Sequence, residues 1–231
     1  MGGSMRTLSI STSTHGRVLV MTPVGVSRKR LPASLPPVVL VGFHGYAQNA
    51  EDMMDVLQRM PGSDECTLVS IQAMNRFYAR GDQKVVANWM TRQDRDEAIA
   101  DNIAYVDRAL GENGVGSCFE TTPDPVLLFM GFSQGVAMAY RAGLMGKRPA
   151  AGIVAIGGDI APDVQSVPAD RWPRVMIAAG AKDQWYTPDK VAADETFLRA
   201  HGVNFDIHRS DAGHEVTDDM LAAVARFIAN A

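Results

Sequence analysis

One serine in this sequence lies between two glycines. It belongs to Gly131-Phe132-Ser133-Gln134-Gly135, which follows the apolar run 125–130 and opens the helical pattern 133–147. A G-x-S-x-G sequence between a strand and a helix forms a sharp turn that exposes the serine hydroxyl at the end of a sheet. Glycines are needed on both sides because larger side chains would collide with the adjoining strand and helix. The pattern therefore predicts that Ser133 is a nucleophile, with a purely structural turn as the alternative.

A serine hydroxyl is a weak nucleophile unless a base removes its proton. The sequence contains five histidines, which are His15, His44, His201, His208 and His214. We expect His214 to be the base because it lies in a glycine-containing loop between the last strand-like run and the last helical pattern. His44 follows another strand-like run, and we expect it to brace a turn by side-chain hydrogen bonds. The residues after His214 lack the second histidine of an H-E-x-x-H zinc site, so we expect no metal and no other cofactor.

A carboxylate is needed to orient the base and to stabilise its protonated form. Asp183 lies just beyond a strand-like run. The order Ser133, Asp183, His214 is the order of serine, acid and histidine in α/β-hydrolases. Asp183 is the preferred candidate for the acid, and Asp159 and Asp211 remain alternatives.

Attack on a carbonyl carbon creates a negatively charged oxygen, which backbone amides can stabilise. The amide of Gln134, directly after the serine, is one expected donor. The second donor should come from the turn in Gly42-Phe43-His44-Gly45-Tyr46, where glycine lets the backbone bend inward. The sequence therefore predicts the amides of Tyr46 and Gln134 as the two oxyanion donors.

Strand-like runs alternate with helical patterns along the chain. The runs cover 17–22, 37–44, 66–72, 125–132, 151–158, 174–180 and 203–210, and the helical patterns cover 49–60, 94–114, 133–147, 187–202 and 217–231. Several runs are apolar at nearly every position, as in strands that are buried on both faces of a parallel sheet. The alternation predicts an α/β fold with a mostly parallel central sheet, helices on both faces and an antiparallel edge formed by the first run. We expect one domain over residues 1–231, with residues 1–5 as a loose end and without a large lid domain.

Composition and charge argue against several classes of partner. The net charge is −4, so we expect no nucleic-acid partner. The two cysteines, Cys66 and Cys118, form no C-x-x-C motif, which indicates packing roles in a reducing compartment. No apolar run approaches the roughly 18 residues of a membrane span, and the N-terminus does not resemble a signal peptide. We therefore expect a cytoplasmic protein without a stable membrane anchor. The sequence does not fix the oligomeric state, and a homodimer is the assembly to test.

The segments around these residues resemble the phospholipase/carboxylesterase branch of the α/β-hydrolases, which includes the acyl-protein thioesterases. The resemblance extends from about residue 36 to the C-terminus. The similar segments are FHGYAQNAEDM (43–53), ANWM (87–90), GFSQGVAMA (131–139), GAKDQWYTP (180–188) and AGHEVTDDMLAAVARFI (212–228). The resemblance implies that Ser133, Asp183 and His214 form a catalytic triad and that Tyr46 and Gln134 supply the oxyanion donors. It also implies that the tryptophan of ANWM overhangs the active site.

The sequence departs from that family at positions that affect the substrate. Tyr46 stands where leucine is more common, and Trp185 and Tyr186 follow the acid where small or aliphatic residues are more usual. These aromatic side chains would narrow an acyl pocket, so we expect a preference for short or compact acyl groups.

The stretch 73–93 shows no clear periodicity and predicts an irregular loop that covers the cleft. Its Phe77, Tyr78, Trp89 and Met90 are candidates to line a substrate cleft, with packing beneath the loop as the alternative. The predicted substrate-binding residues are Phe77, Trp89, Met90, Trp185 and Tyr186.

Together, these residues predict a serine hydrolase that cleaves a small-molecule ester or thioester through an acyl-serine intermediate. Two other functions remain open. A hydrolase fold can serve as a catalytically silent binding module, although every expected catalytic position is filled here. An aminopeptidase-like serine enzyme would need a paired acidic cluster to bind a peptide N-terminus, and none stands out in the sequence.

Overall fold

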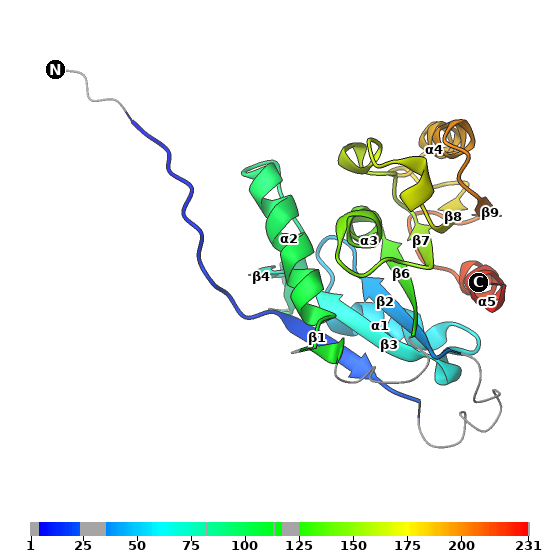
Figure 1. Cartoon of the computed structure of the whole chain (residues 1–231), viewed down its shortest axis with the longest axis horizontal. Helices are drawn as coiled ribbons and strands as arrows, with labels where there is room; N and C mark the ends of the chain where they lie inside the picture. Colours follow the sequence, from blue (N-terminus) through cyan, green and yellow to red (C-terminus); the bar gives the residue numbers. More distant parts are fainter. Residues whose placement is uncertain (1–4, 24–35, 82, 113, 117–124, 231) are drawn as a thin grey trace.

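The computed structural model describes residues 5–23, 36–81, 83–112, 114–116 and 125–230. Cys118 and the first four residues of the predicted loose end lie outside these ranges. Residues 5–16 are exposed and contain no helix or strand. Figure 1 shows this segment extending outward from the start of β1 (Arg17–Met21), away from the sheet.

The centre of the fold is a seven-stranded sheet. Its strands, in spatial order, are β1, β3 (Thr67–Gln72), β2 (Val38–Phe43), β6 (Val126–Phe132), β7 (Gly152–Ile156), β8 (Arg174–Gly180) and β9 (Phe205–Ser210). All neighbouring pairs are parallel except β1 and β3, which are antiparallel. The predicted mostly parallel sheet with an antiparallel first strand is confirmed. The parallel strands all end at the same edge of the sheet, which is where ligands bind in such folds.

Helices cover both faces of this sheet (Figure 1). They are α1 (Ala50–Arg59), α2 (Arg95–Ala109), α3 (Gln134–Met145), α4 (Pro188–Ala200) and α5 (Asp218–Ala229). Helices α2, α3 and α4 contribute to one apolar core and α1 and α5 to another, and successive strand residues alternate between the two. In β2, for example, Val39 and Val41 join the first core and Leu40 joins the second. The predicted helices on both faces are confirmed, and none in the described part of the chain is long and apolar enough to cross a membrane.

Two of the helices begin at residues that suit a helix start. At α1, the Asn49 side chain accepts the Asp52 N–H and the Asp52 carboxylate accepts the Asn49 N–H, each at 3.0 Å, which forms a capping box. At α4, Thr187 is the N-cap residue and Pro188 the first helical residue, and the Thr187 side chain makes no capping hydrogen bond. These starts determine where the loops after β2 and β8 end.

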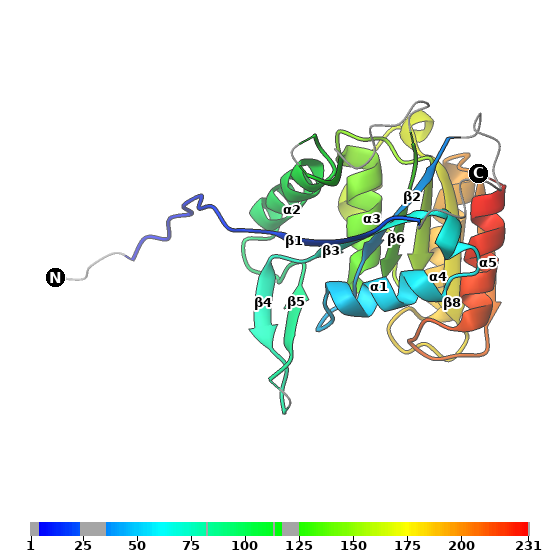
Figure 2. The same ribbon diagram turned by 90° about the horizontal axis from the view of Figure 1, so that it is seen from below.

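The irregular loop predicted over residues 73–93 is wrong in its central part. Residues Asn75–Tyr78 and Val85–Asn88 form an antiparallel pair, β4 and β5. With four residues each, these strands are too short for a hydrophobic period to be recognised in the sequence. The Ala47 N–H donates to Ala87 O at 3.1 Å and the Ala87 N–H donates to Gln48 O at 2.8 Å, so the hairpin is attached to the turn after β2. Figure 2 shows the hairpin projecting away from the sheet beside α1.

Candidate active site

Ser133 occupies the turn between β6 and α3. Its backbone has φ 53° and ψ −120°, a conformation that residues with a side chain rarely adopt. A Cβ on Gly131 would lie 2.4 Å from the carbonyl oxygen of Gly135, and a Cβ on Gly135 would lie 2.0 Å from the carbonyl oxygen of Phe43. Strand, turn and helix therefore pack so closely that only glycine fits at these two positions.

The three residues of the predicted triad lie in one hydrogen-bonded chain. Ser133 Oγ is 2.8 Å from His214 Nε2, and His214 Nδ1 is 2.8 Å from Asp183 Oδ2. Because an ionised carboxylate can only accept, Nδ1 carries the proton and Nε2 is left to accept from the serine hydroxyl. The His214 ring also lies 5.1 Å from the ring of Phe132, the residue before the serine. The loop after β9 is thereby held over the end of β6.

Asp183 is buried, and both of its carboxylate oxygens are engaged. Oδ1 accepts the backbone N–H groups of Trp185 at 2.7 Å and Tyr186 at 2.9 Å, while Oδ2 faces His214. Burial, the largest single effect, would raise the pKa of this carboxyl. The hydrogen bonds from His214 and the two amides outweigh it together and hold the pKa below its ordinary value. The Asp183 side chain therefore stays ionised near neutral pH.

The two alternative acids pair with lysines instead. Asp159 Oδ2 is 3.6 Å from Lys190 Nζ, and Asp211 Oδ2 is 2.9 Å from Lys182 Nζ. Of the three candidates, Asp183 is the one that the structure brings to the histidine. Over the described ranges, no group of three or more His, Cys, Asp or Glu side chains is arranged to hold a metal ion.

The turn after β2 contains one amide without a protein acceptor. The Gly45 N–H donates to Gln48 Oε1 at 2.7 Å, the Gln48 N–H donates to Gly45 O at 3.3 Å, and the Ala47 N–H binds the hairpin. Within the described part of the chain, the Tyr46 N–H has no such acceptor. The turn lies against the serine, since a Cβ on Gly45 would be 3.3 Å from Ser133 Cβ. The other predicted donor, the amide after the serine, is in the first turn of α3, where helix geometry supplies no acceptor.

His44 braces this turn, as predicted. Its Nε2 accepts the Ala73 N–H at 3.0 Å, so Nδ1 carries the proton and donates to Gly45 O at 2.7 Å. Burial lowers the pKa of His44 and keeps the ring neutral. The backbone carbonyl of His44 accepts the indole N–H of Trp89 at 2.8 Å. The turn is therefore tied both to the end of β3 and to the segment after β5.

The side chain of Gln134 makes a contact that was not predicted from the sequence. Its Oε1 accepts the Trp89 N–H at 2.9 Å, and its Nε2 donates to Met90 O at 3.0 Å. The side chain thus ties residues 89–90 to the first residue of α3, next to the serine. The sequence carried no signal for this contact, because it joins positions more than 40 residues apart.

A cavity of about 400 Å³ opens at Ser133 and His214. Of the five predicted substrate-binding residues, Met90, Trp185 and Tyr186 line it. Trp185 is 73% exposed, whereas Tyr186 is almost fully buried, so the two aromatic side chains differ in how much surface they offer to solvent.

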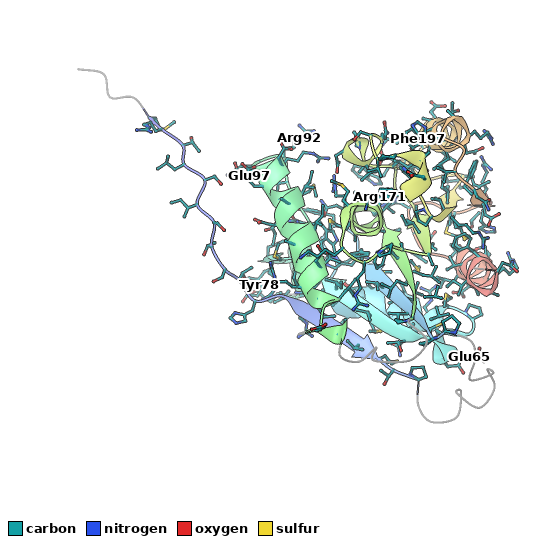
Figure 3. The ribbon with its side chains drawn as sticks, in the orientation of Figure 1. Glu65, Tyr78, Arg92, Glu97, Arg171 and Phe197 are labelled. Atoms are coloured by element: carbon teal, nitrogen blue, oxygen red, sulfur yellow. The ribbon has the colours of Figure 1, made fainter. Side chains whose placement is uncertain are left out.

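The structure does not place Phe77, Tyr78 or Trp89 in the cavity lining. The Trp89 side chain is fully buried, with its ring 5.6 Å from that of Phe43. Phe77 packs against Tyr46 at 5.7 Å, and Figure 3 shows Tyr78 on the hairpin, apart from α3. The reason is that Phe77 and Tyr78 lie on β4 of the hairpin and Trp89 belongs to the apolar core.

The cavity also has basic side chains, which are not among the residues predicted from the sequence. Among the described residues, four basic side chains line it, and Asp159 is the one carboxylate that does. The four are Arg92, Arg95, Arg141 and Lys190. Gln134, Ala137 and Arg141 share one face of α3, because their spacing of three and four residues matches the helix period. An arginine in an otherwise uncharged helix was the available sequence signal.

A mostly parallel sheet with the Ser133 turn after β6, the Asp183 loop after β8 and the His214 loop after β9 has the arrangement of the α/β-hydrolase fold. A family model described as phospholipase/carboxylesterase matches residues 30–231. The chain therefore belongs to the phospholipase/carboxylesterase family, which confirms the resemblance stated above. No curated protein sequence matches the chain significantly.

Several solved structures are similar to the chain. The acyl-protein thioesterase 2 of Zea mays has a TM-score of 0.69 at 18% sequence identity, and the match covers 94% of this chain and 99% of that one. The carboxylesterase from Mesorhizobium loti has a TM-score of 0.66 at 22% identity, with 84% and 89% covered. The Bacillus cereus carboxylesterase has a TM-score of 0.69 at 15% identity, with 93% and 94% covered. At these identities the likeness shows a shared fold.

Proposed function

We propose that the protein is a serine hydrolase that cleaves carboxylic esters or thioesters. The observation that carries this proposal is the hydrogen-bonded chain from Ser133 through His214 to Asp183, which begins at a strained turn at the edge of the sheet. Membership of the phospholipase/carboxylesterase family supports the choice of an ester-type substrate.

In the proposed first half-reaction, Ser133 Oγ attacks the carbonyl carbon while His214 Nε2 accepts the hydroxyl proton. Asp183 holds the ring and stabilises its positive charge. The carbonyl oxygen becomes an oxyanion, which accepts hydrogen bonds from the amides of Tyr46 and Gln134. The bond to the alcohol or thiol then breaks, the leaving group takes the proton from His214, and the acyl group remains on the serine.

The second half-reaction releases the acyl group. His214 Nε2 removes a proton from a water molecule, whose oxygen attacks the acyl carbon. The same two amides stabilise the second oxyanion. When this intermediate collapses, Ser133 Oγ takes the proton back from His214, and the carboxylic acid leaves.

The proposed substrates carry short or compact acyl groups. The cavity of about 400 Å³ lies near the lower end of the range for small-molecule pockets. Trp185 and Tyr186 line it, whereas Tyr46 does not, so the two aromatic residues after Asp183 are the ones that narrow the cavity. Action in the cytoplasm remains a prediction from the sequence, and a homodimer remains the assembly to test.

The direct test is labelling with a fluorophosphonate, which reacts with activated serines. We expect mass spectrometry to find the label on Ser133 in the wild-type protein and none in Ser133→Ala. A folded wild-type protein that takes no label would overturn the proposal and favour a catalytically silent binding module.

A substrate panel separates the enzyme classes. We expect Ser133-dependent hydrolysis of p-nitrophenyl esters and thioesters, with the rate falling as the acyl chain lengthens. Faster Ser133-dependent hydrolysis of aminoacyl amides than of either ester class would favour an aminopeptidase-like enzyme.

A further inference from the structure

The wall of the cavity is positively charged, although the protein as a whole has a net charge of −4. Arg92, Arg95, Arg141 and Lys190 line it against one carboxylate, Asp159. Asp159 lies 3.6 Å from Lys190, so it offsets the charge of that lysine. The three arginines come from other elements, since Arg141 lies on α3 and Arg92 and Arg95 lie around the start of α2.

Arg141 is a buried cation that the cavity reaches. Its side chain has no exposed surface, and it is the one charged residue of α3. Burying a guanidinium is costly unless it is paired, and Asp163 pairs with it through Nε and Nη2, both at 2.7 Å. A third donor, on Nη1, is 3.5 Å from the weak acceptor Sδ of Met90. A guanidinium has five N–H groups, so among the described residues two of them have no acceptor.

Arg92 and Arg95 extend the positive charge from the buried guanidinium to the mouth of the cavity. Both are exposed, and Figure 3 shows Arg92 beside the amino end of α2, where Glu97 also lies. Arg95 is 3.9 Å from Asp163, whose two oxygens already serve Arg141, and no carboxylate among the described residues pairs with Arg92. The acidic residues of the first turn of α2, Asp96 and Glu97, do not line the cavity.

From this geometry we infer that the cavity selects esters or thioesters that carry a carboxylate several bonds away from the reacting carbonyl. The exposed Arg92 and Arg95 bind that carboxylate, and the buried guanidinium of Arg141 adds positive charge behind them. This inference rests on the proposed serine hydrolase function. A guanidinium matches a carboxylate in shape as well as in charge.

The placement of Arg141 sets the scale of the substrate. It lies seven residues after Gln134, which is about 10 Å along the helix axis. Long side chains in a helix lean toward its N-terminus, so the guanidinium reaches back toward Ser133. A compact acyl group with a terminal carboxylate fits this separation, and a carboxylate on the alcohol or thiol part is the other way to present the same group.

The test compares two substrates that differ in one end group. Mono-p-nitrophenyl adipate and p-nitrophenyl hexanoate have acyl chains of equal length, ending in a carboxylate and a methyl group. The tested variant is Arg92→Gln/Arg95→Gln, which leaves the buried Arg141–Asp163 pair intact. The matched control is Arg108→Gln/Arg226→Gln, two exposed arginines outside the cavity lining. Ser133→Ala gives the background rate for each ester.

We expect the wild-type protein to prefer the adipate ester and the tested variant to lose about 10-fold or more of that preference, mainly through KM. The control variant should keep the preference, and added salt should weaken it in the wild type. An adipate-to-hexanoate ratio that is equal in the tested variant, the control and the wild type would exclude a carboxylate subsite on the acyl side. The inference is overturned if a second pair, with the carboxylate on the leaving group, also shows no difference among the three proteins.

A second pair, 4-acetoxybenzoate and its methyl ester, places the carboxylate on the leaving group. The arginine substitutions could lower the preference for the charged ester in this pair alone. That result would support the inference and assign the charged subsite to the alcohol side. Ser133-dependent hydrolysis of hexanoate without any charge preference would leave the proposed function standing and overturn only the inference. Absence of hydrolysis together with absence of fluorophosphonate labelling would overturn both.

Discussion

The two segments that border Ser133 are held in place by different kinds of interaction. The turn 131–135 is fixed by backbone packing, since its glycines leave no space for a Cβ. The segment 89–95 is fixed by side chains from elsewhere, because Gln134 binds it at two points and Asn102 Nδ2 donates to its first carbonyl at 2.7 Å. The first segment therefore tolerates few substitutions, whereas the second can be altered one side chain at a time.

The largest expected effect comes from removing the chemistry that the turn presents. Ser133→Ala and His214→Ala should each lower kcat/KM by on the order of 10⁴-fold or more, because the two residues act as one unit. Steady-state hydrolysis of a p-nitrophenyl ester measures this, with thermal unfolding as the check on folding. Ser63→Ala, on the turn before β3, is the matched control and should keep full activity. Substantial activity in Ser133→Ala would show that the turn is only structural.

A smaller effect is expected when the second segment is released. Gln134→Ala keeps the backbone amide but removes both hydrogen bonds to residues 89–90, one of which leaves the buried amide of Trp89 unpaired. We expect kcat/KM to fall by about 10–100-fold as the cavity wall shifts. The free energy of unfolding should fall by about 1–3 kcal/mol, as measured by urea denaturation.

A labelling experiment and a control variant show whether Gln134→Ala affects only residues 89–95. The Gln134→Ala protein should still take the fluorophosphonate label on Ser133, whereas the exposed control Gln58→Ala should match the wild type in every measurement. Loss of labelling would show that the turn and the segment are not held independently, which contradicts the comparison.

The difference between local backbone packing and contacts from distant side chains also decides how much of the molecule the sequence could predict. The strands, the helices and the nucleophile turn follow from neighbouring residues, such as the glycines on either side of Ser133. The β4–β5 hairpin, the contacts of the Gln134 side chain and the Arg141–Asp163 pair join distant positions and have no local pattern. Trp89 illustrates the error that results. Its neighbours in sequence suggested a cover over the site, but its indole N–H is committed to the carbonyl of His44.

On the side of the cavity that carries Tyr186, a buried carboxylate holds the cavity wall, and we expect its contribution to stability to depend on pH. Asp194 of α4 accepts the Tyr186 hydroxyl at 2.8 Å and the Ile160 N–H at 3.1 Å. Burial raises the pKa of Asp194 to about 6, above its ordinary value of 3.8, so folding favours the protonated form. The corresponding stability is fully present below about pH 4 and is lost as the pH rises through about 6.

Asp194→Asn removes this titration while keeping the shape of the side chain. Relative to the variant, the wild-type protein should therefore lose up to about 3 kcal/mol in the free energy of unfolding between pH 4 and 7. Urea denaturation across that pH range measures the difference. Asp170→Asn, at an exposed carboxyl, is the control and should follow the pH dependence of the wild type. A difference between wild type and Asp194→Asn that does not change with pH would contradict the assignment.

The smallest effect is expected at Tyr46, where a backbone amide and an exposed side chain belong to the same residue. The side chain is 60% exposed and packs on Phe77 outside the cavity lining, so Tyr46→Ala should change kcat/KM by only about 2–3-fold. It should also leave the order of preference among acyl chain lengths unchanged, since this side chain does not border the cavity.

Tyr46→Pro sharpens the comparison, because it removes the same side chain and the amide hydrogen as well. If that amide is an oxyanion donor, the proline variant should lose about 10²–10³-fold in kcat relative to Tyr46→Ala. The loss counts only if thermal unfolding and fluorophosphonate labelling show that the turn and Ser133 are intact. Equal rates for the alanine and proline variants would assign the second donor to another group. A large effect of Tyr46→Ala alone would show that the side chain, and not only the backbone of this turn, determines which substrates react.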